Sequence, residues 1–353
     1  MREITIIYIT VLLLLIGCKS PNLIKYELRK VRDISLNIPN YIDINSFSHT
    51  SDIQILNKDT FLTFIDQVDE KIYTYKFGEK NLESTKFYRY GPNQLKSEPY
   101  LVKVLSNEEI LIICQREVVF SNRNKEVNVS KEISLKDEST DLTGGDSYWF
   151  RQYIDKEYAY FFKFDFSKGR YDNKLIRFTL NSGEQEEINI PLHYTEIMNE
   201  DKSKGGIKTS ILLPQVSFSE GKIIFSSWYS NKVFIGKNEL ILPYLNNHYE
   251  FIKNSDSGDE IFNLDTEEGS NATLIFDSFE NILIVDKIKT NKETGLIKNE
   301  LCFFDIEGNL LNCVDSKGLL KFHSAGYLYF LNILEAEDKA TFSIYRISDV
   351  SSH

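Results

Sequence analysis

Short apolar runs recur along this chain with a long period, and the recurrence limits the folds that it can adopt. The runs begin near Thr60, Glu109, Glu157, Lys222, Asn281 and Gly326. A more alternating run follows each of them, starting near Lys71, Glu117, Lys174, Lys232, Glu300 and Thr341. Both kinds of run are rich in Ile, Phe, Tyr and Val, which favour β-strands, and turn residues separate them. The sequence therefore predicts repeated β units rather than helices.

A four-stranded unit of about 56 residues is typical of a propeller blade, whose inner strands are apolar on both faces because neighbouring blades cover them. The clearest unit runs from Thr273 to Asp315, and the last unit shows three strands. A spare strand lies near Ile34 to Ile38. We therefore predict an all-β fold: a six-bladed β-propeller of four-stranded antiparallel blades, with the ring closed by that N-terminal strand. The alternative is a pair of β-sandwich domains, which would lack the long period.

The first residues, MREITIIYITVLLLLIGCKS, have the character of an export signal. Their apolar stretch, from Ile4 to Ile16, is shorter than the roughly 20 residues that span a membrane. The residues LIGC, at positions 15–18, overlap the end of this stretch and resemble the bacterial lipobox, where the cysteine thiol receives diacylglycerol before cleavage. We expect a lipoprotein signal peptide over 1–17, an anchor and linker over 18–33 and the propeller domain over 34–353. The alternative is an ordinary secretory peptide.

Lipidation of Cys18 would set the location of the protein. Several acyl chains, such as palmitate, anchor a protein stably, whereas one chain holds it marginally. We expect a protein of the cell envelope, anchored in the outer membrane and facing either the periplasm or the cell surface. On this interpretation the membrane is contacted through the N-terminal lipid only.

The composition excludes some partners. Removal of residues 1–17 leaves 336 of the 353 residues, enough for a large core. The chain has 52 acidic and 41 basic residues, a net charge of −11, and its basic residues form no cluster apart from acidic neighbours. We therefore expect no nucleic-acid partner.

Besides Cys18, the chain has three cysteines. Cys114 lies in the apolar run EEILIICQ and is expected to be buried. Cys302 and Cys313 flank the turn DIEGN. If residues 305 and 310 lie opposite each other, the two cysteines also lie opposite each other. A cross-strand disulfide is then possible in an oxidising compartment, and two buried free thiols are the alternative.

Several motifs resemble a family of lipid-anchored six-bladed propellers from Bacteroidota, a domain family of unknown function. YRYGPNQ, from Tyr88 to Gln94, resembles the family's GPN element. The lipobox and the segments FSNRNKEV, SSWYSNKVF and FFDIEGNLL extend the resemblance over most of the mature chain, although Asn124 replaces a usual turn glycine. The resemblance implies a fold and a location, but no chemistry.

The sequence offers no catalytic or metal-binding signature. The histidines, at positions 49, 193, 248, 323 and 353, have no metal-ligand spacing, and we interpret them as surface or loop residues. Neither GxSxG nor a catalytic cysteine context is present. The acidic segment from Asn254 to Ser270 lacks the EF-hand order and is interpreted as a solvated loop between blades. We therefore expect no cofactor and no metal, and we assign no residue a catalytic role.

Polar and aromatic residues near predicted strand ends form a candidate binding face, since such groups at one end of a propeller can make a ligand platform. The candidates are Arg89, Asn93, Gln94, Trp149, Arg151, Trp228, Tyr229 and Asn231. The alternative is that both tryptophans pack between blades.

Two functions follow from this interpretation. One is a non-catalytic binding or scaffold propeller whose partner is a glycan, a peptide or an envelope protein. The other is an envelope lyase or hydrolase, acting on polysaccharide or peptide, with its site on the axial loops. Titratable groups with shifted pKa values converging on the axis would favour the enzyme.

Overall fold

The computed structural model describes most of the chain after the N-terminal segment. The described residues are 25–37, 47, 50–79, 81–89, 94–123, 125–134, 153–154, 157–165, 170–189, 214–219, 222–227, 231–243, 249–253, 260–264, 270–290, 294, 297–334 and 339–350. Cys18 and the signal segment lie outside them. Within the described ranges, no helix has the length and apolar character needed to cross a membrane.

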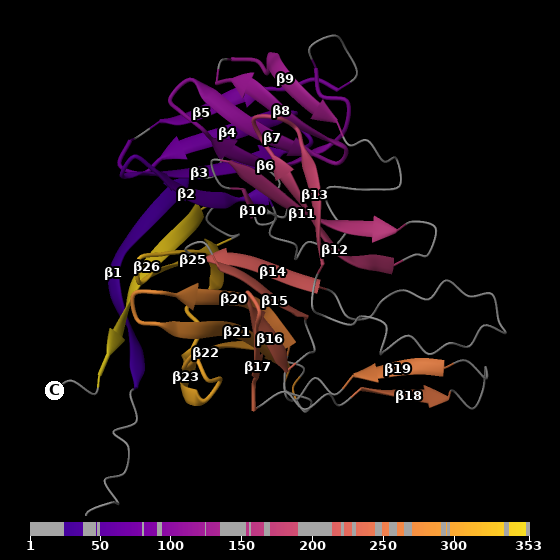
Figure 1. Cartoon of the computed structure of the whole chain (residues 1–353). Helices are drawn as coiled ribbons and strands as arrows, with labels where there is room; N and C mark the ends of the chain where they lie inside the picture. The colour runs from indigo at the N-terminus through magenta and orange to yellow at the C-terminus, as the bar shows by residue number, and fades with distance from the viewer. Residues whose placement is uncertain are drawn as a thin grey trace, which may run out of the picture.

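The described strands form six four-stranded antiparallel sheets, numbered here as sheets 1 to 6 (Figure 1). Sheet 1 contains β2 (Asp52–Leu56), β3 (Asp59–Asp66), β4 (Lys71–Lys76) and β5 (Leu82–Lys86). Sheet 2 contains β6 (Pro99–Val104), β7 (Glu109–Cys114), β8 (Glu117–Asn122) and β9 (Val129–Ser134). Sheet 3 contains β10 (Tyr153–Ile154), β11 (Tyr158–Asp165), β12 (Arg170–Thr179) and β13 (Gln185–Asn189).

The second half of the chain repeats the pattern. Sheet 4 contains β14 (Pro214–Ser219), β15 (Lys222–Ser227), β16 (Lys232–Ile235) and β17 (Asn238–Ile241). Sheet 5 contains β20 (Ser270–Asp277), β21 (Ile282–Thr290), β22 (Ile297–Phe304) and β23 (Leu310–Asp315). Sheet 6 contains β24 (Leu319–Ser324), β25 (Tyr327–Leu334), β26 (Lys339–Asp349) and β1 (Tyr26–Asn37). The chain is an all-β propeller with four-stranded antiparallel blades, as predicted.

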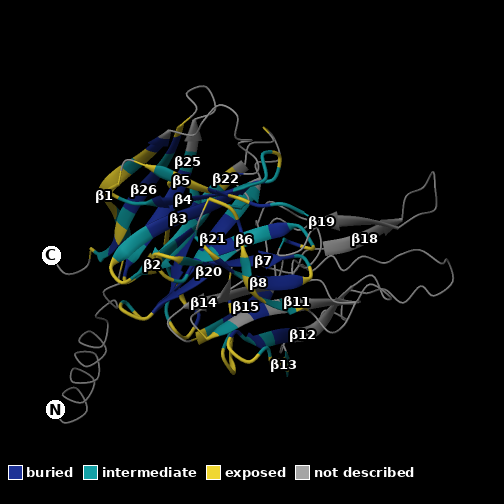
Figure 2. Cartoon of the chain, turned by 90° about the horizontal axis from the view of Figure 1, so that it is seen from above, coloured by how far each residue is buried: buried dark blue, intermediate teal, exposed yellow. Residues whose placement is uncertain are grey.

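The hydrophobic core lies between neighbouring sheets. One cluster joins Ile53 and Phe64 of sheet 1 to Phe342 of sheet 6, and another joins Ile72 of sheet 1 to Ile112 of sheet 2. Further clusters join sheets 2 and 3, sheets 4 and 5, and sheets 5 and 6. Figure 2 shows buried residues along the strands and exposed ones mainly in turns and along β1. Among the described residues, five of the contacts between neighbouring sheets are therefore apolar clusters, as the apolar runs of the sequence indicate.

The N-terminal strand completes sheet 6. β1 pairs with β26 from Tyr26, opposite Asp349, to Asn37, opposite Lys339. The expected linker over 18–33 is therefore wrong for residues 26–33, which belong to a strand. Sequence patterning missed them because β1 is an edge strand, charged and mostly exposed, in which Glu27 pairs with Arg29 and Lys30 with Asp33. Charged side chains of this kind discourage a second chain from pairing with an exposed edge.

The strand order gives the sheets two different ends. At one end lie the turns that join the second strand of a sheet to the third, such as 66–70. The connections between sheets, such as 87–97, lie at the same end, which is called the linker face. Turns from the first to the second and from the third to the fourth strand occupy the other end, the terminal face, where β1 begins and β26 ends. Tyr329 and Thr60, each close after a first-to-second turn, share a hydrogen bond between sheets 6 and 1. Both of these turns therefore lie at the same end.

Two turns at opposite faces have the same local design. Asp66 Oδ1 accepts hydrogen bonds from the backbone N–H groups of Val68 and Asp69, at 2.9 and 3.0 Å. Asp277 Oδ1 accepts them from Phe279 and Glu280, at 2.8 and 3.0 Å. The fifth residue is left-handed in both, with φ 52° at Glu70 and φ 55° at Asn281. Aspartate favours such turns because its side chain can replace a backbone acceptor.

One strand pair was not predicted. β18 (Tyr249–Lys253) and β19 (Glu260–Leu264) form a two-stranded antiparallel sheet, which Figure 1 shows apart from the four-stranded sheets. The interpretation of residues 254–270 as a loop is therefore wrong for 260–264 and for Ser270, which begins β20. Acidic residues around Glu260 obscured the short alternation of EIFNL.

Substitutions in β1 should separate core packing from mere pairing. Leu36 is buried in the cluster between sheets 6 and 1, whereas Val31 is exposed at a register shift of the same strand. We expect Leu36→Ala to lower the free energy of unfolding by about 2–5 kcal/mol, because it removes buried apolar volume. The matched control Val31→Ala should change it by less than about 0.5 kcal/mol. Urea denaturation measures both, and equal effects would contradict the docking of β1 against sheet 1.

Candidate functional site

The connection from sheet 1 to sheet 2 is the best-defined polar region of the linker face. Phe87 and Leu95 are buried at its two ends. Phe87 N–H donates to Glu70 O at 2.8 Å, and Leu95 N–H donates to Tyr88 O at 3.1 Å. The connection is thereby fixed to the turn of sheet 1 on one side and closed on itself. Gly91, Pro92 and Asn93, the GPN letters, lie outside the described residues.

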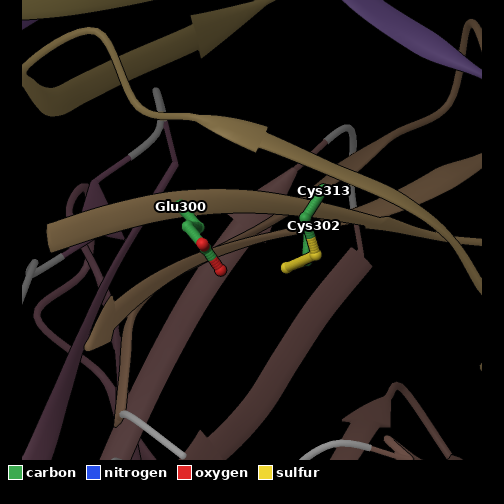
Figure 3. A group of neighbouring side chains, drawn as sticks. All are labelled: Glu300, Cys302 and Cys313. Carbon is green, nitrogen blue, oxygen red and sulfur yellow. A yellow bond between two sulfur atoms is a disulfide. The ribbon is translucent and has the colours of Figure 1, made fainter. Parts of the chain in front are cut away.

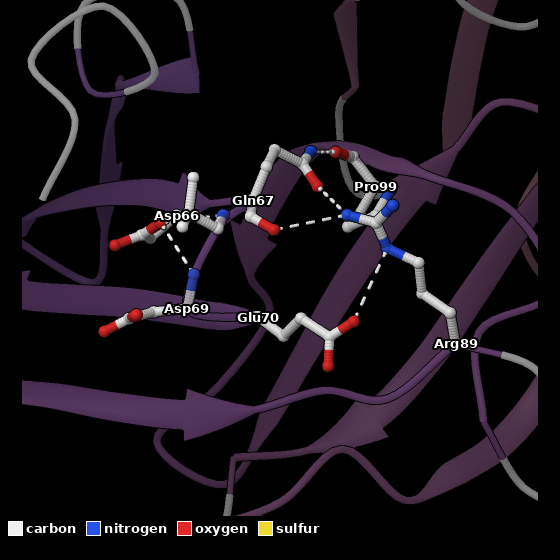
Figure 4. Close-up of polar contacts among 7 residues, drawn as sticks. Asp66, Gln67, Asp69, Glu70, Arg89 and Pro99 are labelled. Atoms are coloured by element: carbon white, nitrogen blue, oxygen red, sulfur yellow. Dashed lines mark hydrogen bonds and ion pairs between the residues drawn. The ribbon is translucent and has the colours of Figure 1, made fainter.

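Arg89 links this connection to the turn between β3 and β4 (Figure 4). Its Nη2 donates to the side-chain Oε1 of Gln67 at 2.9 Å and to the backbone oxygen of Gln67 at 3.3 Å. Arg89 Nε lies 3.8 Å from Glu70 Oε1, an ion pair without a hydrogen bond. The Gln67 amide in turn donates to the backbone oxygen of Pro99, at the start of sheet 2. Arg89 is therefore held by its neighbours and gives the face a fixed cationic group.

A second polar group extends the face over sheet 2. Glu117 Oε1 accepts the backbone N–H groups of Lys96 and Ser97, at 2.5 and 3.1 Å. Burial raises the pKa of Glu117, although these two hydrogen bonds act in the opposite direction. Lys96 Nζ donates to Glu132 Oε1 at 2.6 Å. The Glu117 carboxylate thus orders the chain after the GPN element.

Cys114 is buried beside this carboxylate. Burial raises the pKa of its thiol well above the usual range, and the Glu117 charge raises it further. A thiol of this kind is a poor nucleophile because little thiolate forms. Cys114 is a core residue, as the sequence indicated.

Three of the eight candidate binding residues lie in the described part of the chain. Arg89 and Gln94 are half-buried in the connection between sheets 1 and 2, and Asn231 is half-buried between β15 and β16. Asn231 O accepts the N–H of Leu242 at 2.7 Å. Both segments belong to the linker face. The remaining candidates lie outside the described residues: Asn93, Trp149, Arg151, Trp228 and Tyr229.

Sequence reasoning missed Gln67, Glu70 and Glu117, which hold the linker-face residues in place. Nothing in their local pattern distinguishes them from other turn and strand residues. The rule that second-to-third strand turns meet the connections between sheets could have brought Gln67 and Glu70 next to Arg89. Glu117 follows an apolar run directly and precedes another, and this position was the available sign of burial.

A buried histidine was also misinterpreted. His323 belongs to β24, its side chain is 6% exposed, and its Nε2 lies 2.7 Å from Oδ2 of the fully buried Asp277. The expectation of a surface or loop histidine is therefore wrong for His323. Its strand, LLKFHS, alternates poorly, and its partner comes from sheet 5. Because both groups are enclosed, the pair connects two neighbouring sheets on the terminal face and offers little access to a substrate.

Acidic groups gather around this pair. Burial, and then the charges of Glu280, Asp349 and Asp277, raises the pKa of the Tyr26 hydroxyl to about 12. Tyr26 N–H donates to Asn312 Oδ1, and the Asn312 amide donates to Tyr26 O, both at 2.9 Å. The start of β1 is therefore fixed to sheet 5 as well as to β26.

Cys302 and Cys313 are opposite each other in β22 and β23 and form a disulfide (Figure 3). The turn behind them differs from the expected one, because Asp305 N–H donates to Asn309 O, so residues 305 and 310 do not pair. A register shift places Phe304 opposite Leu310 and Phe303 opposite Asn312. This β-bulge restores the register in which the two cysteines face each other.

Glu300 lies close to the disulfide, but the three residues do not suit a metal ion (Figure 3). A metal-binding cysteine must be a thiolate, and both sulfur atoms are bonded to each other. Glu300 also pairs with Lys289 at 2.6 Å and with Lys298 at 3.5 Å. The arrangement is a disulfide beside a paired carboxylate.

The two matched aspartate turns allow the Asp277–His323 pair to be tested. Burial raises the pKa of Asp277, but hydrogen bonds from His323 and from backbone N–H groups together lower it by more, so the net pKa lies below its usual range. We expect Asp277→Asn to lower the free energy of unfolding by about 1.5–3 kcal/mol near pH 7, because a charge-assisted hydrogen bond is lost. The control Asp66→Asn keeps the same turn acceptor, lacks a histidine partner and should cost less than about 1 kcal/mol.

The lowered pKa of Asp277 also predicts how the stability difference between the wild type and Asp277→Asn changes with pH. A carboxylate with a lowered pKa in the folded state stabilises the protein above its ordinary pKa, and this stabilisation is lost as the pH falls through the folded value. Urea denaturation of the wild type and Asp277→Asn should therefore show a difference that shrinks below about pH 4. A difference independent of pH would contradict this account.

Comparison with known proteins identifies the fold. No protein-family model matches the chain, and no curated protein matches it. A crystal structure of a DUF4221 family member from Bacteroides vulgatus is similar, with a TM-score of 0.63 and 12% identity over 92% of this chain and 99% of the other. PQQ-bound aldose sugar dehydrogenase from Streptomyces coelicolor gives a TM-score of 0.46 and 9% identity, over 92% and 99%. The likeness to the Bacteroides protein is a likeness of fold: both chains are β-propellers.

Proposed function

We propose that this protein is an exported lipoprotein, anchored in the outer membrane through Cys18, whose propeller binds a partner at the linker face without catalysis. The observation that carries the proposal is the fixed polar network around Arg89, Gln67 and Glu70. Such a network presents charged and amide groups in set positions, which a glycan, a peptide or an envelope protein can recognise by hydrogen bonds. The network also includes part of the GPN element, on which the family resemblance was based.

We further propose that the six sheets form one closed six-bladed ring. The pairing of β1 with β26 and the clusters that join sheets 4, 5, 6, 1, 2 and 3 in succession support this arrangement. The short β10, of two residues, makes sheet 3 the least regular of the six. The Leu36→Ala and Val31→Ala pair tests the closure.

Binding, rather than catalysis, is favoured by the use of the titratable groups. Glu117 accepts backbone hydrogen bonds, Glu132 pairs with Lys96, and Asp277 pairs with His323. In the described part of the chain, Glu117 and Glu132 lie together around Lys96 on sheet 2, whereas Asp277 lies with His323 on the opposite face. Because each of these carboxylates already accepts a hydrogen bond within the protein, the arrangement favours binding over a lyase or hydrolase.

The anchor is tested by the mass of the N-terminal peptide of the full chain purified from membranes. We expect the mature protein to begin at Cys18 with diacylglycerol on its thiol. In the control Cys18→Ala, we expect the unprocessed precursor, because the thiol that is modified before cleavage is absent. A mature N-terminus at any other residue would show that the chain is not a lipoprotein.

The binding face is tested by screening the mature protein against a glycan array and a peptide library, and then titrating the best ligand. We expect Gln94→Ala and Asn231→Ala to weaken binding about tenfold, equivalent to about 1.4 kcal/mol. The control Lys237→Ala changes an exposed residue in the β16–β17 turn, on the terminal face, and should leave the affinity unchanged. If Lys237→Ala alone loses binding, the site lies on the terminal face instead. Chemical conversion of the ligand by the protein would favour an enzyme.

A further inference from the structure

The N-terminal segment that would carry the lipid is too short to allow every orientation of the propeller. Six residues lie between Cys18 and Lys25, the first described residue, so seven Cα–Cα steps join them. Fully extended, at roughly 3.3–3.6 Å per step, these steps reach at most about 25 Å. The chain enters the propeller at Tyr26, on the terminal face. The terminal face is therefore held close to any membrane that contains the lipid.

The point of entry favours one orientation. β1 pairs with β26 from Tyr26 on the terminal face to Asn37 at the opposite end, so the N-terminal segment joins the propeller on the terminal face. A short segment at that end brings either the terminal face or the adjoining side of the propeller nearest to the membrane.

Exposed apolar side chains on the terminal face distinguish these two orientations. Phe279 is 71% exposed at the β20–β21 turn, Ile306 is exposed at the β22–β23 turn, and Val350 is exposed after β26. Val350 N–H donates to Lys25 O at 2.8 Å, which places this apolar residue beside the point where the N-terminal segment leaves. At the linker face, the exposed large apolar residues of the described chain are Val68 in the β3–β4 turn and Ile241 at the end of β17, both distant from the point where the N-terminal segment leaves.

Charges near Phe279 indicate which lipids suit this surface. Glu280 follows Phe279 directly, and its pKa is raised by burial and by the charges of Asp277 and Asp349. These carboxylates disfavour an anionic surface. Around Phe279 the single charge of Arg346 acts against these carboxylates, so the local balance is acidic and fits a zwitterionic bilayer better than an anionic one.

We propose that the terminal face rests on a zwitterionic lipid surface, with Phe279, Ile306 and Val350 entering the headgroup region, and that the linker face points away from the membrane. The inference rests on the proposed anchor and adds a second membrane contact, whereas the sequence indicated contact through the lipid only. It also places the proposed binding face where a partner can approach it.

Photo-crosslinking tests the orientation with two matched positions. Phe279 and Val68 occupy the third position of the two aspartate turns of equal design and are 71% and 76% exposed. Each is replaced in turn by p-benzoylphenylalanine, and the lipidated protein is reconstituted in vesicles of phosphatidylethanolamine and phosphatidylcholine. After irradiation, mass spectrometry should find lipid adducts at position 279 and none at position 68. Adding phosphatidylglycerol to the vesicles should reduce the adducts at 279.

A second arm separates this inference from the anchor itself. Residues 18–353, produced without lipid, are coupled through the Cys18 thiol to a maleimide lipid in the same vesicles, so that the segment has the same length. If this arm gives adducts at position 279 but Cys18 carries no lipid in cells, the membrane contact of the terminal face is supported and the lipid anchor at Cys18 is rejected. The opposite outcome is lipid on Cys18 together with equal adducts at both positions, or with protein–protein crosslinks at position 279. It would support the anchor and overturn the proposed contact between the terminal face and the bilayer.

Discussion

The structure depends on the burial of each sheet by the next. The middle strands of these sheets are apolar on both faces, so a single sheet of this sequence would expose two apolar surfaces to water. Packing against a neighbouring sheet on each side buries these surfaces, at roughly 25 cal/mol for each Å² buried. Phe64 of sheet 1 illustrates the result, since it packs with Phe342 of sheet 6 while Phe61 of the same strand faces the cluster shared with sheet 2. Neighbouring sheets are consequently mutually dependent, and the faces at their ends can vary without disturbing the core.

The parts of the fold that follow from local pattern were predictable. The second and third strands of each sheet were found because their apolar residues are continuous or alternate, and their period identified the propeller. β1 was found only over residues 34–38, because Tyr26 and Leu36 are its buried residues and charged residues separate them. The cysteine pairing shows a limit of register arguments. The premise about residues 305 and 310 failed, and a bulge in β23 nevertheless brought Cys302 opposite Cys313.

The polar sites were harder to predict because their members come from different sheets. Arg89 was selected for its position in the GPN element, but its partners Gln67 and Glu70 precede it by about 20 residues and have no motif of their own. His323 and Asp277 are 46 positions apart, and neither strand shows a sign of the other. Sequence patterns report the face and period of one segment, whereas such pairs depend on how the ends of two segments meet.

The pairing of β1 with β26 also sets the order in which the molecule can be completed. Asp33 in β1 accepts a hydrogen bond at 2.8 Å from the hydroxyl of Ser343, 310 positions later, so the first strand to leave the ribosome must wait for the last. Contacts between such distant segments form late in folding. During that interval β1 has no partner, and its charged sequence, YELRKVRD, keeps it soluble. The same charges that made the strand difficult to recognise would thus protect the growing chain from aggregation before the last sheet is finished.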